Sequence, residues 1–238
     1  MFKLILSFII CSAIPVYAEN YELHNHNNYS YDNSYENERI LFILDYSNSM
    51  NEFLEGQRKV DLMTETIKEI LPKINPKTSV GLRVYGHKNG FTPIDACRAS
   101  VLYNPILPDN GINIENSLLK LKPKGMTPIT YSLKQAVKDD FLGFRGIKHI
   151  ILLTDGGENC DESACKYVME LIKVRHDVKI DVIAFNVNNT DDLAQLECTS
   201  LVTSGKFYNA QTSAQLINSL NNSINSAKKV EAKLIKNP

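Results

Sequence analysis

Residues 40–50 read ILFILDYSNSM, a continuous apolar run that ends in a turn of polar residues. A short run of this kind suits a strand buried on both faces, as the strands of parallel sheets are. The next segment, residues 60–71, carries apolar side chains at the spacing of an amphipathic helix and stops at Pro72. A buried strand followed by such a helix predicts the first unit of an α/β fold.

The same alternation continues along the chain. We predict further strands at residues 79–85, 147–153, 180–187 and 206–208, an edge strand at 99–107, and helices at 112–121, 129–141, 162–174, 191–202 and 213–226. Pro105 suits an edge strand because proline cannot donate a hydrogen bond to a neighbouring strand. The pattern predicts one α/β domain over residues 39–228, a doubly wound, mostly parallel sheet of six strands with one antiparallel edge strand and helices on both faces.

The first 18 residues are typical of an export signal, with Lys3 before an apolar stretch and small residues up to Ala18. The apolar stretch is roughly 13 residues long and contains Pro15, whereas a membrane-spanning helix needs ~20. We therefore expect cleavage rather than a retained anchor, no transmembrane segment after cleavage, and a secreted or periplasmic protein. A lipid-modified Cys11 is a weaker alternative, since large aliphatic residues precede it.

The segments on either side of the predicted domain are polar. Residues 19–38 consist mainly of Asn, Tyr and Glu, which predicts a disordered linker, and residues 229–238 form a basic tail. His24 and His26 in the linker could hold a metal, but exposed histidines more often hold none. Lys plus Arg number 26 against 27 Asp plus Glu, so the formal net charge of -1 disfavours a nucleic-acid partner.

Four cysteines lie beyond the signal: Cys97, Cys160, Cys165 and Cys198. An even number of cysteines in an exported chain predicts two disulfides. A structural zinc site is the competing interpretation, but the chain has no paired CxxC motifs. Three connectivities remain open on these grounds.

Polar side chains follow two of the predicted strands and fill a third loop. Asp45, Ser47 and Ser49 follow the first strand, Asp155 follows the most apolar strand, and Thr127 lies in the loop GMTPI. Ligands bind at the carboxyl ends of strands in doubly wound sheets. Two carboxylates forced together there repel each other unless a cation lies between them.

Three hydroxyls and two carboxylates are a hard, all-oxygen ligand set. Such a set suits Mg²⁺, with Mn²⁺ or Ca²⁺ as alternatives, and does not suit Zn²⁺. Five protein groups are one short of an octahedron, so one coordination position stays open. We expect that position to accept a carboxylate from a partner.

These residues resemble the metal-ion-dependent adhesion site of the von Willebrand factor A (VWA) family. Its DxSxS element matches at Asp45, Ser47 and Ser49, its lone threonine at Thr127, and its TDG aspartate at Asp155. The likeness covers about residues 39–228, and the runs VYGH, GMTPI and TDGGENC resemble an exported bacterial branch of the family. The resemblance implies serines that contact the ion directly, a threonine and aspartates that contact it directly or through water, and an acidic ligand that completes the shell.

The resemblance also implies a sheet order of 3-2-1-4-5-6. In that order the loops that follow the second and fourth strands meet over the metal site. This implies a Cys97–Cys160 disulfide, and it leaves Cys165 and Cys198 on neighbouring helices of one face. The alternative pairs Cys160 with Cys165 and makes Cys97 reach Cys198 across the sheet.

The function expected from this site is binding rather than catalysis. We expect a monomer that holds a divalent cation and recruits a protein or other ligand that offers a carboxylate. The alternatives are a metal-dependent hydrolase of the cell envelope and a VWA subunit of a larger envelope complex. A phosphotransfer hydrolase would place a second acid at the position of Ser47.

A catalytic nucleophile would need an adjacent base, and among the histidines of the predicted domain only His87 is placed near the site. His149 and His176 are expected to be structural. Glu158 and Asn159 follow the metal aspartate and either shape the rim of the site or are polar loop residues without partners.

Overall fold

The computed structural model describes residues 39–160 and 162–234, with side chains of the last helix described up to residue 225. The signal expected at residues 1–18 and the linker expected at 19–38 lie outside the described residues. Of the basic tail expected at 229–238, the part up to Leu234 is the end of a helix, and residues 235–238 lie outside the description.

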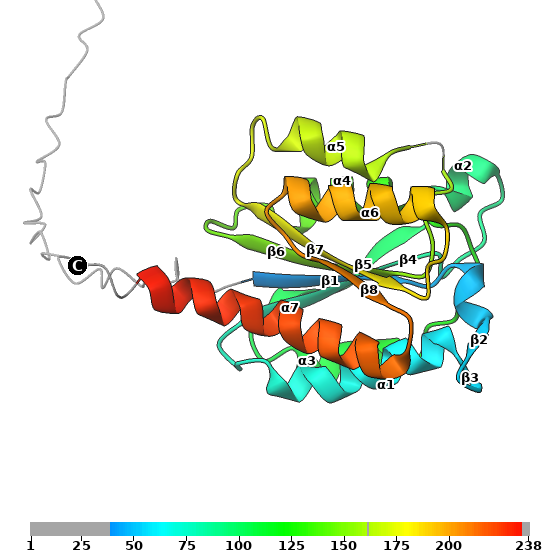
Figure 1. Ribbon diagram of the computed structural model, residues 1–238, viewed down its shortest axis with the longest axis horizontal. Helices are drawn as coiled ribbons and strands as arrows, with labels where there is room; N and C mark the ends of the chain where they lie inside the picture. The colour runs from blue at the N-terminus through cyan, green and yellow to red at the C-terminus, as the bar shows by residue number, and fades with distance from the viewer. Residues whose placement is uncertain (1–38, 161, 235–238) are drawn as a thin grey trace, which may run out of the picture. The chain divides into compact units, whose positions relative to one another are not determined.

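A six-stranded sheet in the order β5-β4-β1-β6-β7-β8 forms the centre of the domain (Figure 1). Its strands are β1 (Arg39–Asp45), β4 (Ser79–Tyr85), β5 (Ser100–Leu107), β6 (Lys148–Thr154), β7 (Val178–Phe185) and β8 (Phe207–Ala210). Within this sheet the β4–β5 pair at the edge is antiparallel, and the other four strand pairs are parallel. The fold class and the strand order expected from the sequence are both confirmed.

Helices cover both faces of the sheet (Figure 1). On one face lie α1 (Lys59–Ile70), α3 (Gly111–Leu118) and α7 (Ser213–Leu234). On the other face lie α4 (Ile129–Gln135), α5 (Ala164–Leu171) and α6 (Thr190–Val202). Shorter elements are the helical turns η2 (Asn48–Asn51), η3 (Leu71–Lys73), η4 (Ala136–Asp140) and α2 (Pro93–Ala96), and the hairpin β2 (Phe53–Leu54) with β3 (Gln57–Arg58). Among the described residues, no helix is both long and apolar enough to cross a membrane.

The unbroken apolar run of β1 is explained by its place between two helical layers. Ile40 and Phe42 pack into the core under α1 and α7, whereas Leu41 and Ile43 pack into the core under α4 and α5. Each of these side chains is at most 1% exposed. Burial of one such side chain contributes about 1.5–3 kcal/mol. Since successive residues of a strand face opposite sides, a strand with helices on both sides must be apolar throughout.

The observed elements differ from the predicted ones mainly at their ends. The helix predicted at 129–141 is α4 followed by the wider π-helical turn η4. The helix predicted at 162–174 is α5, which begins at Ala164, because Ser163 accepts a hydrogen bond from the backbone N–H of Lys166 and caps the helix, and which ends at Leu171. The hairpin β2–β3 was not predicted, since its strands are only two residues long and carry no alternating pattern.

Two disulfides tie the loops and helices together. Cys97–Cys160 joins the segment after β4 to the loop after β6, with Cα atoms 5.5 Å apart. Cys165–Cys198 joins α5 to α6, with Cα atoms 5.4 Å apart. The pairing implied by the family resemblance is confirmed, and the alternative with a Cys160–Cys165 pair is excluded.

Candidate metal centre

The candidate site lies at the carboxyl edge of the sheet, where β1 and β6 end side by side. Asp45 is the last residue of β1, and Asp155 directly follows β6. The third segment reaches them through the backbone, because Ser47 pairs with Gly125 in a parallel bridge. Thr127 stands two residues beyond that bridge. The structure therefore brings all three predicted segments to one edge of the sheet.

A glycine makes this approach of the three segments possible. The Gly86 carbonyl oxygen accepts hydrogen bonds from the backbone N–H groups of Lys124, at 3.0 Å, and Gly125, at 2.7 Å. Gly86 has φ +71°, and a Cβ added to it would lie 2.5 Å from the backbone nitrogen of Ser47. Only glycine fits such a contact and such a φ without displacing the neighbouring backbone.

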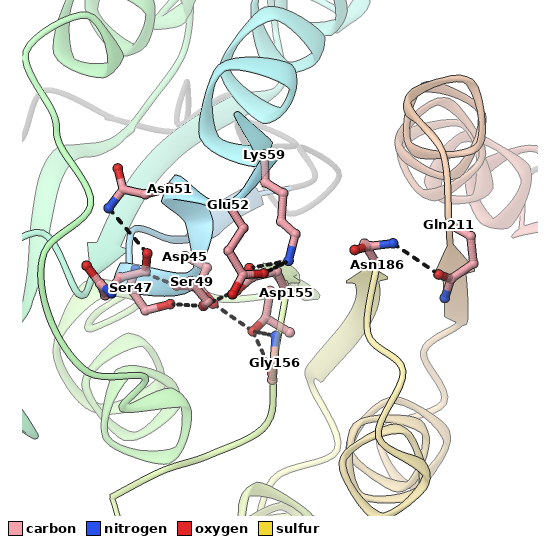
Figure 2. A network of polar contacts seen from close by, with 12 residues as sticks. Asp45, Ser47, Ser49, Asn51, Glu52, Lys59, Asp155, Gly156, Asn186 and Gln211 are labelled. Carbon is pink, nitrogen blue, oxygen red and sulfur yellow. Dashed lines mark hydrogen bonds and ion pairs between the residues drawn. The ribbon is translucent and has the colours of Figure 1, made fainter. Parts of the chain in front are cut away.

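Hydrogen bonds join four of the five predicted site residues, as Figure 2 shows in part. The backbone N–H of Ser47 donates to Asp45 Oδ1 at 2.7 Å. The Ser47 and Ser49 hydroxyl oxygens are 3.0 Å apart, and Ser49 Oγ donates to Asp155 Oδ1 at 2.6 Å. The second oxygen of Asp45 accepts a 2.8 Å hydrogen bond from Thr154 Oγ1, a contact that the sequence analysis missed.

The fifth predicted residue, Thr127, is held through its backbone. Its N–H donates to Asn159 Oδ1 at 2.7 Å, and its side chain is buried. The neighbouring Glu158 accepts hydrogen bonds from the backbone N–H groups of Thr130, at 2.7 Å, and Cys160, at 3.1 Å. Glu158 and Asn159 thus have partners, and they fasten the loop after β6 to the threonine loop.

Burial makes the negative charge of the two aspartates costly. Burial raises the pKa of Asp45 to about 6, the nearby charge of Asp155 adds to the rise, and hydrogen bonds from Ser47 and Thr154 oppose it. Burial also raises the pKa of Asp155 above its ordinary value, although Ser49 and Lys59 act against the rise. A bound cation would stabilise the charged form of both carboxylates.

Lys59 is the main site neighbour that the sequence analysis missed. Its Nζ lies 3.1 Å from Asp155 Oδ2 and 2.8 Å from Glu52 Oε2, and its side chain is only 5% exposed (Figure 2). Burial works against the charge of the ammonium, but the hydrogen bonds to Glu52 and Asp155 prevail and hold the pKa of Lys59 above its ordinary 10.5. The sequence carried no signal for this contact, since a lysine at the start of a helix is usually exposed.

The family model of the von Willebrand factor type A domain, which describes the family's sequences, matches residues 40–223 of this chain. The chain belongs to this family. A curated relative, the uncharacterized protein YwmD of Bacillus subtilis strain 168, is 30% identical over 166 residues, which cover 66% of this chain and 72% of YwmD.

Solved structures share the VWA fold. The von Willebrand factor type A structure from Catenulispora acidiphila superposes with a TM-score of 0.64 at 16% identity, covering 80% of this chain and 43% of that one. Proximal thread matrix protein 1 from the mussel byssus, solved with a zinc-occupied MIDAS motif, has a TM-score of 0.60 at 20% identity, covering 79% of this chain and 45% of that one. This VWA chain therefore spans less than half the length of either solved protein, and at these identities the likeness concerns the fold.

The candidate site of this VWA domain consists mainly of hydroxyls and paired carboxylates. Within the described ranges, no group of three or more His, Cys, Asp or Glu side chains is arranged to hold a metal ion. Cys97, Cys160, Cys165 and Cys198 are paired in disulfides, and the side-chain atoms that Asp45, Ser47, Ser49 and Asp155 bring together are oxygens.

His87, the histidine placed nearest to the site by its sequence position, is packed as a neutral ring. It is 7% exposed, and its ring meets the edge of Tyr103 at a centroid distance of 5.3 Å. Neither ring nitrogen has a hydrogen-bond partner among the described residues. Burial lowers the pKa of His87 to about 4, and the charge of Lys88 adds to this effect. His149 is fully buried elsewhere in the sheet, with Nε2 3.1 Å from Asp181 Oδ2.

Proposed function

We propose that this VWA domain is a binding module that holds a divalent cation and recruits a protein or other ligand through a carboxylate. The ion would be held by the oxygen atoms of Asp45, Ser47, Ser49, Thr127 and Asp155. The observation that carries the proposal is the convergence of two buried carboxylates and the Ser47–Ser49 hydroxyl pair at one edge of the sheet.

The chemistry of the donors supports Mg²⁺ as the ion, with Mn²⁺ or Ca²⁺ as alternatives. Hard cations prefer oxygen ligands, and Mg²⁺ prefers six of them. The zinc-occupied MIDAS motif of the mussel thread protein supports a divalent ion at a related site. When bound, the ion supplies a Lewis-acidic position for a partner's carboxylate.

We also propose that the protein is exported and acts as a monomer in the periplasm or outside the cell. The two disulfides support this location, because such bonds persist in oxidising compartments. Residues 1–18 would then be the cleaved signal, residues 19–38 a linker and residues 229–238 a basic tail. The burial of His87 against Tyr103 favours a binding role over hydrolysis by a serine or cysteine nucleophile, since such a nucleophile needs a base in contact with it.

Calorimetric titration of the exported chain with Mg²⁺ tests the proposal. We expect one site in the wild type, and at least about tenfold weaker binding after Asp45→Ala or Thr127→Ala, since each removes a ligand. Asp191→Ala is the matched control, because it removes an exposed carboxylate from the first turn of α6. Retention of a partner from a cell-envelope extract should require Mg²⁺ and be lost in EDTA. Unchanged Mg²⁺ binding in folded Asp45→Ala and Thr127→Ala proteins would refute the site.

A further inference from the structure

Lys59 is fixed in place by two contacts with a single residue. Its backbone N–H donates to the carbonyl oxygen of Glu52 at 2.9 Å, and its Nζ donates to Glu52 Oε2 at 2.8 Å. Lys59 is the first residue of α1, a helix that packs against the core. Figure 2 shows the extended lysine side chain running from this helix towards Asp155. The ammonium is therefore held at the site by the fold rather than by a flexible surface contact.

The two oxygen atoms of the Asp155 carboxylate contact different partners. Its Oδ1 accepts the 2.6 Å hydrogen bond from Ser49, and its Oδ2 lies 3.1 Å from Lys59 Nζ. The side chain of Asp155 is 0% exposed and that of Lys59 is 5% exposed. Charges this deeply buried are weakly screened by water, so the lysine acts strongly on any charge bound beside Asp155.

The lysine changes the charge that a metal ion meets. Asp45 and Asp155 together carry two negative charges, and Lys59 offsets one of them. Glu52 adds a negative charge, but its side chain is 65% exposed and is therefore screened by solvent. A divalent ion would make the buried site neutral without Lys59, whereas the site keeps a positive charge with Lys59 present. A positive site attracts an anionic ligand more strongly.

We propose that Lys59 sets the charge balance of the metal site, lowering its affinity for the divalent ion and raising the affinity of the ion-loaded site for a carboxylate. This inference rests on the proposed function. A purely structural ion pair that only orients Asp155 makes the opposite prediction, because loss of the lysine would then weaken metal binding.

Substitutions that separate charge from hydrogen bonding test the inference. Lys59→Gln keeps a donor for Asp155 without the charge, Lys59→Met removes both, and Lys59→Arg keeps the charge. In calorimetric titrations with Mg²⁺, we expect about tenfold tighter binding for the Gln and Met variants, and binding within about threefold of wild type for Arg. Lys68→Met is the matched control, because it removes a partly exposed lysine about 14 Å further along α1 that pairs with Glu115.

A second measurement concerns the ligand. Sodium acetate, as a simple carboxylate, is titrated into Mn²⁺-saturated protein while water-proton relaxation reports displacement of water from the ion. Lys59→Gln should require about tenfold more acetate than the wild type, and Lys68→Met should not differ from it.

The outcomes separate the two hypotheses. Tighter Mg²⁺ binding together with weaker acetate binding in the Lys59→Gln variant supports the charge role of Lys59. The Lys59→Gln result is sufficient for this conclusion if the Lys59→Met variant does not fold. Unchanged or weaker Mg²⁺ binding in a folded Gln variant overturns this inference while the proposed metal site stands. A wild-type protein that binds neither Mg²⁺ nor Mn²⁺ overturns the proposed function itself.

Discussion

Replacement of Asp45 by Asn should stabilise the protein in EDTA while removing its response to Mg²⁺. The side chain of Asp45 is fully buried, and its pKa is raised from 3.8 to about 6, first by burial and then by the charge of Asp155. One pKa unit corresponds to about 1.4 kcal/mol, so ionisation of Asp45 at pH 7 costs the folded state about 3 kcal/mol. An asparagine cannot ionise and avoids this cost.

The hydrogen-bond partners of Asp45 can also accommodate an asparagine. The Asn side-chain oxygen can still accept the hydrogen bond that Ser47 N–H donates to Asp45 Oδ1. The Asn amide can donate to Thr154 Oγ1, because the Thr154 hydroxyl has a second acceptor, the Gly156 carbonyl oxygen, at 2.8 Å. Both hydrogen bonds that Asp45 accepts from Ser47 and Thr154 thus have counterparts in the Asn variant, so the removed charge dominates the change in stability.

The pH dependence has a defined sign. The folded pKa of Asp45 lies above the unfolded value, so the folded state binds more protons between about pH 4 and pH 6, and wild-type stability falls as pH rises through this window. The stability difference between Asp45→Asn and wild type should therefore grow from near zero at pH 4 to about 3 kcal/mol at pH 7. Taking the difference between the two proteins cancels the opposing titration of His87, whose pKa is lowered to about 4.

Thermal and urea unfolding in EDTA, with disulfides intact, measure this difference. About 3 kcal/mol corresponds to a rise of ~6–12 °C in Tm for a domain of this size. With Mg²⁺ at 100 times its Kd, the wild type should gain about 2.7 kcal/mol and the variant almost nothing. An Asp45→Asn protein that is less stable than wild type in EDTA at pH 7, or that gains equally from Mg²⁺, would refute the reasoning.

Three further predictions concern the support of the site and the core. Gly86→Ala should lower stability by about 2–4 kcal/mol and weaken Mg²⁺ binding in calorimetry, because its φ is +71° and its Cβ would meet the Ser47 backbone at 2.5 Å. Removal of the Cys97–Cys160 disulfide by a double Ser substitution should lower the free energy of unfolding by about 2–4 kcal/mol and should also weaken Mg²⁺ binding, because Cys160 adjoins the loop that holds Thr127. Removal of the Cys165–Cys198 disulfide should lower the free energy of unfolding without weakening Mg²⁺ binding. Equal Mg²⁺ affinities for the two double variants would contradict this assignment. Burial acts to raise the pKa of Asp181, but the contacts of Asp181 with His149, Ser223 and Lys179 prevail and lower this pKa to about 2. The protein should therefore lose about 2 kcal/mol of stability as pH falls from about 4 to 2. Urea unfolding curves of Asp181→Asn should not show this loss.

The fold was predictable because its signal is periodic and local. Each buried strand is a short apolar run, and each covering helix repeats its apolar residues at the helical spacing, so the order of elements follows from the chain alone. The ends of elements were predicted less well. The start of α5 depends on the Ser163 cap, and the change from α4 to η4 has no counterpart in the apolar pattern.

The candidate site was predictable only in its chemistry. Asp45, Ser47 and Ser49 lie close together in the sequence and directly after a strand, so their grouping is local. Thr127 and Asp155 were assigned to the same site from the family resemblance and from the rule that ligands bind at the carboxyl ends of parallel strands. The pairing of the cysteines likewise needed the order of the strands, which spacing alone leaves open.

The sequence by itself determined the α/β class, the site residues as candidates and the even number of cysteines after residue 18. Only the tertiary structure decided which partners surround the two aspartates. Thr154 reaches Asp45 across 109 positions of sequence, and Lys59 reaches Asp155 across 96. Such contacts depend on how neighbouring strands and helices pack, and no local pattern records them, because hydrogen bonds and ion pairs act over a few ångströms of space whatever the distance along the chain.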